Sequence, residues 1–250
     1  MNGRMRRLPS SVLVVVAICL VAAACSGPRY RYVRDTHTRT AFRVPTNWTI
    51  FDKATMLGLP PGPQPNVPDP LQWLVGIDGS PQASVSHILN VADLTTDQPQ
   101  GIGLVQTLSF TERDSASISY LRNFLFPVDQ LIQNGSDGAL VSYDDKLVEN
   151  GLHGVHLVLQ FRASKLASAV AASQSAAGSS SDASSNLQRA LLGGAGADVL
   201  SPKFVEVDQK ALIDDAANRV YYVAILCSAT CYQQNRGAIE SAVDSWTVIS

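Results

Sequence analysis

Residues 219–227 constrain the fold of this chain most, because their sequence, RVYYVAILC, is apolar at both alternating sets of positions. A strand with one solvated face alternates polar with apolar residues, whereas a strand covered on both faces is apolar throughout. We therefore predict that residues 219–227 form a central strand that is buried on both sides of its sheet.

Shorter runs of alternating or β-branched residues predict the other strands. They are AFRVP and NWTIF within 41–51, then 71–77, 86–92, 104–110, 139–143, 153–162, 203–213 and 246–249. In 153–162 the apolar side chains share one face, which predicts a strand that is packed on one side only.

Two helices are expected, one before and one after the central strand. The first covers 112–126 and is stopped by Pro127. The second begins at a capping box, Thr230-x-x-Gln233, with Thr230 as the N-cap, and ends near Ser245. This order of elements predicts an α+β fold with a mostly antiparallel sheet. Turns are predicted at Asp144-Asp145, Asn150-Gly151 and Asp214–Asn218.

The N-terminus is typical of an export signal. Residues 1–11 carry Arg4, Arg6 and Arg7 without any acidic residue, and residues 12–24 are all apolar or small. These thirteen residues would span about 20 Å as a helix, less than the roughly 30 Å hydrocarbon core of a bilayer. A signal peptide over 1–24 is therefore favoured over a permanent transmembrane helix.

The signal ends in Val21-Ala22-Ala23-Ala24-Cys25, which resembles the lipobox of bacterial lipoproteins. Ala22 departs from the pattern, because Leu or Val is commonest at that position. The resemblance implies that the Cys25 thiol receives a diacylglycerol and becomes the first residue of the mature chain. We therefore predict lipidation of Cys25 and a lipid-anchored protein on the extracytoplasmic face of the cell membrane. The alternative is an ordinary secretory signal cleaved after Ala24.

Cys227 and Cys231 are the cysteines that remain once the signal is removed and Cys25 is acylated. Because Cys227 closes the central strand and Cys231 opens the next helix, a bond between them would pin that corner. A redox pair or a pair of metal ligands is disfavoured by the spacing and by the lack of a neighbouring His or third Cys. We predict a disulfide between Cys227 and Cys231 and no metal site.

Three segments are predicted to lie outside the regular elements. Residues 25–40 are expected to be a tether, whose arginines and tyrosines either contact anionic headgroups or, as we favour, form a solvated spacer. Residues 58–70 form a Pro-rich loop, and residues 164–198 form a Ser/Ala-rich insert within a hairpin. Residues 41–250 would then make a single domain.

The two ends of this domain resemble the PsbP/Mog1-like family. At the C-terminal end the resemblance lies in RVYYVAILC, a short corner and the helix QQNRGAIESAVDSWTV; at the other end it lies in AFRVPTNWTIF. It implies an α-β-α sandwich around a central, mostly antiparallel sheet. Exported lipoproteins of actinobacteria share this architecture, and the chain resembles them in its lipobox, its Ala/Ser bias and its paired cysteines. The Pro-rich loop and the insert depart from the photosynthetic members.

No catalytic constellation emerges from the sequence. No G-x-S-x-G, H-E-x-x-H or P-loop motif is present. His153 and His156 would lie on opposite faces of a strand and could not ligate one ion, and His153 is expected to be packed in the core. Ser136 and the two Asp pairs are interpreted as turn formers rather than as a nucleophile or calcium ligands.

These observations favour a membrane-anchored, non-enzymatic lipoprotein of the cell envelope with no cofactor. It would bind another envelope protein or an apolar ligand, and its near-neutral net charge of −2 disfavours nucleic acid. The alternative is a carrier of a lipid or another apolar small molecule. A weaker alternative is a hydrolase whose site is not recognisable from the sequence.

Overall fold

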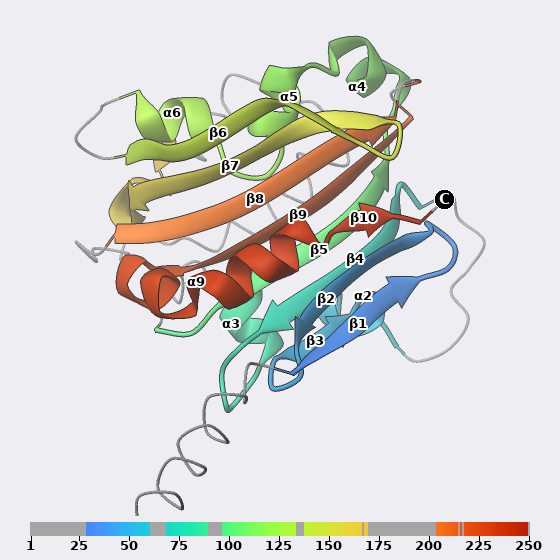
Figure 1. Ribbon diagram of the computed structural model, residues 1–250. Coiled ribbons are helices and arrows are strands. Elements are labelled where there is room, and N and C mark those ends of the chain that lie inside the picture. The colour runs from blue at the N-terminus through green and yellow to red at the C-terminus, as the bar shows by residue number, and fades with distance from the viewer. Residues whose placement is uncertain are drawn as a thin grey trace, which may run out of the picture.

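A seven-stranded antiparallel sheet lies at the centre of the protein, as the computed structural model shows (Figure 1). The structure describes residues 29–60, 69–89, 97–133, 138–166, 168–169, 204–214, 216 and 218–249. The strand order in the sheet is β3-β4-β5-β9-β8-β7-β6. The strands are β3 Thr49–Asp52, β4 Leu71–Asp78, β5 Gln100–Thr107, β6 Gly138–Glu149, β7 Leu152–Arg162, β8 Phe204–Asp214 and β9 Arg219–Ser228.

Strand β9 lies in the middle of this sheet, between β5 and β8. Its residues Tyr222 and Val223 belong to the two different hydrophobic cores, one on each face, and both are fully buried. The predicted central strand, covered on both sides, is therefore confirmed.

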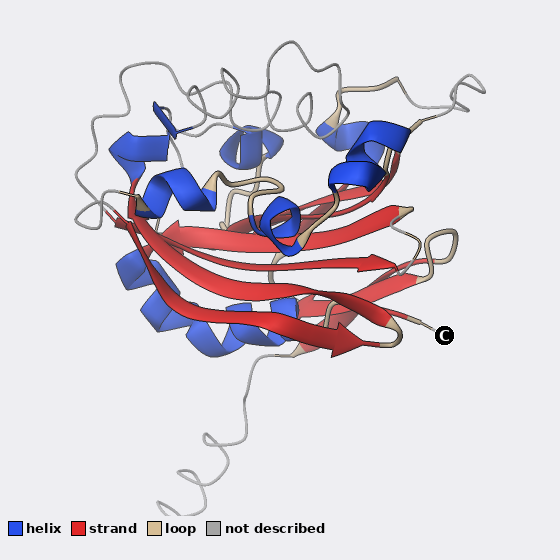
Figure 2. Cartoon of the chain, turned by 90° about the horizontal axis from the view of Figure 1, so that it is seen from above, coloured by secondary structure: helices blue, strands red, loops and turns tan. Residues whose placement is uncertain are grey.

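Short helices cover one face of the sheet (Figure 2). The core on this face joins Leu121 and Leu131 of the helices to Leu157, Val207 and Tyr222 of the strands. The helices are α2 Lys53–Met56, α3 Val85–Leu89, α4 Phe110–Ser115, α5 Ile118–Arg122 and α6 Val128–Ile132.

The other face is covered by one long helix and a small second sheet. The helix is α9, Ala229–Asp244, and the small sheet has the order β1-β2-β10, with β1 Tyr30–Asp35, β2 Thr40–Pro45 and β10 Thr247–Val248. The core here centres on Trp246, whose ring lies 5.1 Å from that of Phe42 and 5.4 Å from that of Trp73, between centroids. The α+β sandwich with helices on both faces is confirmed, and a small sheet completes one of its outer layers.

The predicted tether over 25–40 is wrong for residues Tyr30–Asp35, which form strand β1. This strand pairs antiparallel with β2, and its Val33 lies opposite Phe42 and packs against the core around Trp246. One inward apolar side chain among arginines and tyrosines is thus enough to fix a strand beside β2. Residues 25–28 lie outside the described residues.

The single helix predicted over 112–126 is also wrong. Ser109 and Glu112 form a capping box that starts α4, and the Ser117 side chain accepts a hydrogen bond from the Tyr120 amide and starts α5. A second N-cap within the segment breaks it into short helices, because it offers the backbone amides a partner outside the helix. Pro127 likewise precedes a further helix, α6, rather than ending helical structure.

Three smaller expectations are corrected by the structure. Val85–Leu89 is a helix rather than the start of a strand, and the Ser84 hydroxyl accepts a hydrogen bond from the Ser86 amide at its beginning. Asp144-Asp145 lies within β6 at an irregularity of register, not in a turn between strands. The N-cap of α9 is Ser228 rather than Thr230, since the Ser228 side chain accepts from the Cys231 amide.

The loop at 58–70 and the insert at 164–198 fall mostly outside the described residues. Asn150-Gly151 forms the predicted turn between β6 and β7, and both residues have the positive φ angles of a tight turn. Among the helices of the described ranges, none is long and apolar enough to cross a membrane.

Candidate binding site beside helix α9

A pocket of about 240 Å³ lies between helix α9 and the outer strands β6, β7 and β8. We call it the α9 pocket. Larger hollows of about 540 and 480 Å³ lie at the start and along the side of α9, but their linings bring no buried charged side chains together. The residues of the α9 pocket that matter here are His156, Glu206, Asp208, Tyr232, Arg236 and Asp244.

The polar floor of the pocket follows from the alternation of strand β8. Glu206, Asp208 and Lys210 point toward the layer of α9, whereas Val205 and Val207 point into the opposite apolar core. All three charged residues are at most 3% exposed. Burying a charge costs free energy unless the charge is paired or hydrogen-bonded. Each of the three residues is therefore expected to contact a partner within the protein or to bind a ligand.

Asp208 is the centre of this row, and its side chain is completely buried. Its Oδ1 lies 2.8 Å from Nε2 of His156, and its Oδ2 accepts a hydrogen bond of 3.0 Å from the hydroxyl of Tyr232. Burial and the charge of Asp208 raise the pKa of Tyr232, so this hydroxyl remains a donor. The carboxylate is held from two sides and is pre-organised before any ligand arrives.

His156 lies between two carboxylates. Beyond the contact with Asp208, its Nδ1 lies 3.9 Å from Oδ1 of Asp244. Burial lowers the pKa of His156, but the hydrogen bond and charge of Asp208, with the charge of Asp244, outweigh it and raise the pKa above 6.5. The two carboxylates therefore favour the protonated form of this imidazole more than water does.

Glu206 differs from Asp208 because one of its oxygens is left without a partner. The residue is 2% exposed, and within the described ranges its carboxylate takes part in one hydrogen bond, donated by Gln233 Nε2 to Oε2 at 3.5 Å. Burial raises the pKa of Glu206. Its carboxylate lines the pocket, and Arg236 on the rim pairs with Glu240 at 2.7 Å instead. The second oxygen, which has no hydrogen-bond partner among the described residues, belongs to the lining of the pocket and is therefore available to a donor from outside.

Lys210 is the last charged residue of this row, and its hydrogen bonds stabilise the folded structure. Its ammonium group donates to Glu149 Oε2 at 2.5 Å, to the Trp246 carbonyl at 2.9 Å and to the Asp244 carbonyl at 3.4 Å. A cation at this place satisfies carbonyl groups at the C-terminus of α9, where the helix dipole is negative.

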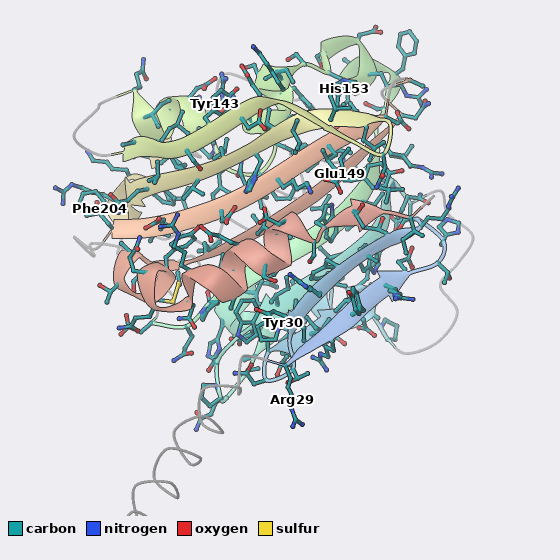
Figure 3. The ribbon with its side chains drawn as sticks, viewed as in Figure 1. Arg29, Tyr30, Tyr143, Glu149, His153 and Phe204 are labelled. Carbon is teal, nitrogen blue, oxygen red and sulfur yellow. A yellow bond between two sulfur atoms is a disulfide. The ribbon has the colours of Figure 1, made fainter. Side chains whose placement is uncertain are left out.

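The predicted disulfide between Cys227 and Cys231 is present, with the two Cα atoms 5.9 Å apart (Figure 3). Both cysteines are buried, and the bond ties the first turn of α9 to the end of β9. The wall of the α9 pocket is therefore covalently fixed at one end. Cys25 lies outside the described residues, so its lipidation remains a prediction.

The other sequence candidates do not form a site. His153 is exposed, so its predicted place in the core is wrong, although it alternates in register with Val155 and Leu157 of the core. His87 does have a carboxylate partner, buried Asp78 at 2.9 Å, which the sequence did not reveal. Asp214 accepts from the Asn218 amide in the predicted turn. Within the described part of the chain, no group of three His, Cys, Asp or Glu could hold a metal ion.

The sequence does not predict the network of His156, Asp208 and Tyr232, because His156 is considered there only as a metal ligand together with His153, and that role is excluded. One signal was available in the strand sequence VEVDQK, where acidic residues alternate with valine next to the most buried strand. An alternating strand of this kind has one apolar face, and its polar face is buried only if another layer covers it.

No family model matches the chain, and no curated protein matches it significantly. Among solved structures, it is similar to the cyanobacterial PsbP (CyanoP) of Synechocystis sp. PCC 6803, with 10% identity and a TM-score of 0.37, over 90% of this chain and 95% of that chain. It is also similar to the Ran-binding protein Mog1p of Saccharomyces cerevisiae, with 9% identity and a TM-score of 0.42, over 90% and 97% of the two chains.

A mutant of protein Mog1 gives a similar result, with 8% identity and a TM-score of 0.41, over 89% of this chain and 97% of that chain. The predicted resemblance to PsbP/Mog1-like domains is confirmed, and at these identities it concerns the fold alone. The chain is therefore described as an α+β domain with a polar pocket beside its long helix.

Proposed function

We propose that this chain is a lipoprotein of the cell envelope, anchored through Cys25, whose folded domain is a non-enzymatic binding module that uses the α9 pocket. The observation that carries the binding role is the carboxylate of Glu206 in the pocket lining, one oxygen of which has no hydrogen-bond partner among the described residues, beside the fixed network of Asp208, His156 and Tyr232. A pre-organised pocket with an unused acceptor suits recognition of a donor group on a partner.

The geometry favours binding over hydrolysis. A histidine that acts as a general base needs a neutral imidazole with one nitrogen facing the nucleophile. In this protein both nitrogens of His156 face carboxylates, Asp208 at 2.8 Å and Asp244 at 3.9 Å, and its pKa is raised. With both nitrogens turned toward carboxylates, the imidazole has no nitrogen directed at a nucleophile such as Ser142 in the pocket lining.

The envelope location is supported by two features of the chain. The leader 1–24 has the organisation of an export signal and is followed by Cys25. The folded domain contains a disulfide, a bond that persists in oxidising compartments outside the cytoplasm.

The test has two parts, carried out in the organism that makes the chain. Mass spectrometry of the N-terminal peptide should find Cys25 acylated, and Cys25→Ser should release the protein from the membrane fraction. Retention of the variant in the membrane would contradict the proposed anchor.

The second part is crosslinking in intact cells, followed by purification of the lipidated chain. A protein partner should be captured by the natural chain and by the control Asp114→Asn, whose carboxylate is exposed on α4, but not by Glu206→Gln. Co-purified lipid in place of a protein would favour a carrier instead. A turnover activity that depends on His156 and Ser142 would favour a hydrolase.

A further inference from the structure

The outer face of the small sheet carries alternating arginines and tyrosines. In the antiparallel pairing of β1 with β2, Tyr32 lies opposite Arg43, and Val33 lies opposite Phe42 on the inward side. The Arg34 guanidinium lies 5.2 Å from the centre of the Tyr32 ring, and that of Arg43 lies 5.0 Å from the centre of the Tyr30 ring. We call Tyr30, Tyr32, Arg34 and Arg43 the arginine–tyrosine face.

Three more arginines lie close to this face along the chain, of which Arg31 alternates with Val33 on the inward side of β1 and donates a hydrogen bond to the Trp48 carbonyl. Arg29, Arg31 and Arg39 are exposed like Arg34 and Arg43. None of the five forms an ion pair with a described residue, and the nearby Asp35 is occupied by the amide and hydroxyl of Thr38.

The chain as a whole carries more acidic than basic residues. Without the three arginines of the leader, it has 16 basic and 21 acidic residues, a net charge of −5. Five unpaired arginines within fifteen residues therefore form a local positive region on an otherwise acidic protein.

The position of this positive region along the chain limits which surfaces it can contact. Tyr30, at the start of β1, is five residues after Cys25, which is at most about 18 Å of extended chain. In Figure 3, Arg29 and Tyr30 lie at this end of β1. Acylation of Cys25 would hold the start of the strand that close to the bilayer surface.

We propose that the arginine–tyrosine face docks on the anionic surface of the membrane in which Cys25 is anchored. The proposal rests on the lipid anchor proposed above. Arginines near a bilayer are attracted to anionic headgroups, and their apolar stems together with tyrosine rings suit the interface between headgroups and acyl chains. The bilayer is the occupant that the short connection brings within reach, and its charge is opposite to that of the face.

Docking in this way would orient the domain. Strand β1 belongs to the small sheet beside α9, whereas β6, which lines the α9 pocket, is at the far edge of the large sheet. Figure 1 shows β1 and β6 at opposite ends of the molecule. The α9 pocket lies on the same face of the large sheet as the small sheet, beyond α9, so docking would fix its position relative to the membrane.

The test uses the full acylated chain in vesicles of phosphatidylcholine, with and without phosphatidylglycerol. Phenylglyoxal modifies accessible arginines, and mass spectrometry gives the rate at each one. We expect Arg34 and Arg43 to be modified several-fold more slowly on the anionic vesicles, with the protection lost at high salt. Arg113, exposed on α4 in the opposite layer, is the internal control and should react equally on both.

A variant with Arg34→Gln and Arg43→Gln should lose the protection of Arg29 and Arg31 on anionic vesicles. A control variant with Lys146→Gln and Arg113→Gln removes two exposed positive charges outside the arginine–tyrosine face. In this control, Arg29 and Arg31 should remain protected on anionic vesicles. Thermal unfolding of both variants checks that each still folds. Equal modification of Arg34 and Arg43 on both kinds of vesicle, with Cys25 acylated, would overturn the docking alone. An unmodified Cys25 would overturn the anchor and the docking together.

Discussion

Replacing Asp208 by Asn tests the central contact of the α9 pocket. The buried carboxylate binds His156 with one oxygen and Tyr232 with the other, and a hydrogen bond to a charged group contributes about 1.5–3 kcal/mol. An asparagine keeps one acceptor oxygen but turns an amide donor toward the second donor. We expect the variant to lose about 2 kcal/mol of unfolding free energy, or roughly 6 °C in Tm for a domain of this size.

The loss should depend on pH through His156. Its folded pKa is raised above 6.5, so its contribution to stability is fully present below pH 6.5 and is lost as the pH rises through the folded pKa. Asp208 supplies the two largest causes of the increase, whereas burial, which lowers the pKa, is the largest cause of all. In Asp208→Asn the pKa of His156 should therefore fall below 6.5.

Two measurements check this reasoning. An NMR titration of the His156 imidazole gives its pKa in both proteins, and urea unfolding gives the stability difference, which should be larger near pH 5.5 than near pH 8.5. The control Asp114→Asn removes a carboxylate from the surface of α4 and should change neither quantity. A His156 pKa that stays above 6.5 in Asp208→Asn, or a stability loss that is equal at both pH values, would refute the argument.

Three other expectations concern the fold, and urea unfolding measures each of them. Changing Cys227 and Cys231 together to Ala should cost about 2 kcal/mol, the chain-entropy value for so short a loop, and a reductant should then have no further effect on the variant. Trp246→Ala should lower the free energy of unfolding by about 4 kcal/mol. Trp246→Phe should lower it much less, because the buried indole nitrogen has no hydrogen-bond partner among the described residues. Equal losses of stability in the two variants would contradict this account. Gly154→Ala should cost about 3 kcal/mol, because its Cβ would lie 1.9 Å from a carbonyl oxygen of β8, while Gly237→Ala, with open space on α9, should stabilise by about 1 kcal/mol.

The elements that could be predicted are those whose pattern of apolar residues shows which of their faces are buried. Strand β9 is apolar at every inner position, and α9 places Tyr232, Ile239, Ala242 and Val243 on one buried face. The short elements could not be predicted in the same way, because single side chains decide them. Ser117 is the N-cap of α5, directly after Ala116, the C-cap of α4.

The site could not be predicted because it depends on register. His156 and Asp208 are 52 residues apart, and they meet because β7 and β8 pair with His156 opposite Lys210, which places Asp208 diagonally beside it. A shift of the pairing by one residue would place Asp208 among the apolar side chains of the opposite face. The Ser/Ala-rich insert between the two strands has no pattern that specifies this register.

The small sheet joins residues that are synthesised at very different times. Strand β2 pairs with β1 on one side and with β10, about 200 residues later, on the other. The layer beside α9 therefore cannot assemble until Thr247 and Val248 are available. In a chain with this topology, the outer layer beside α9 closes only after the last strand has been synthesised.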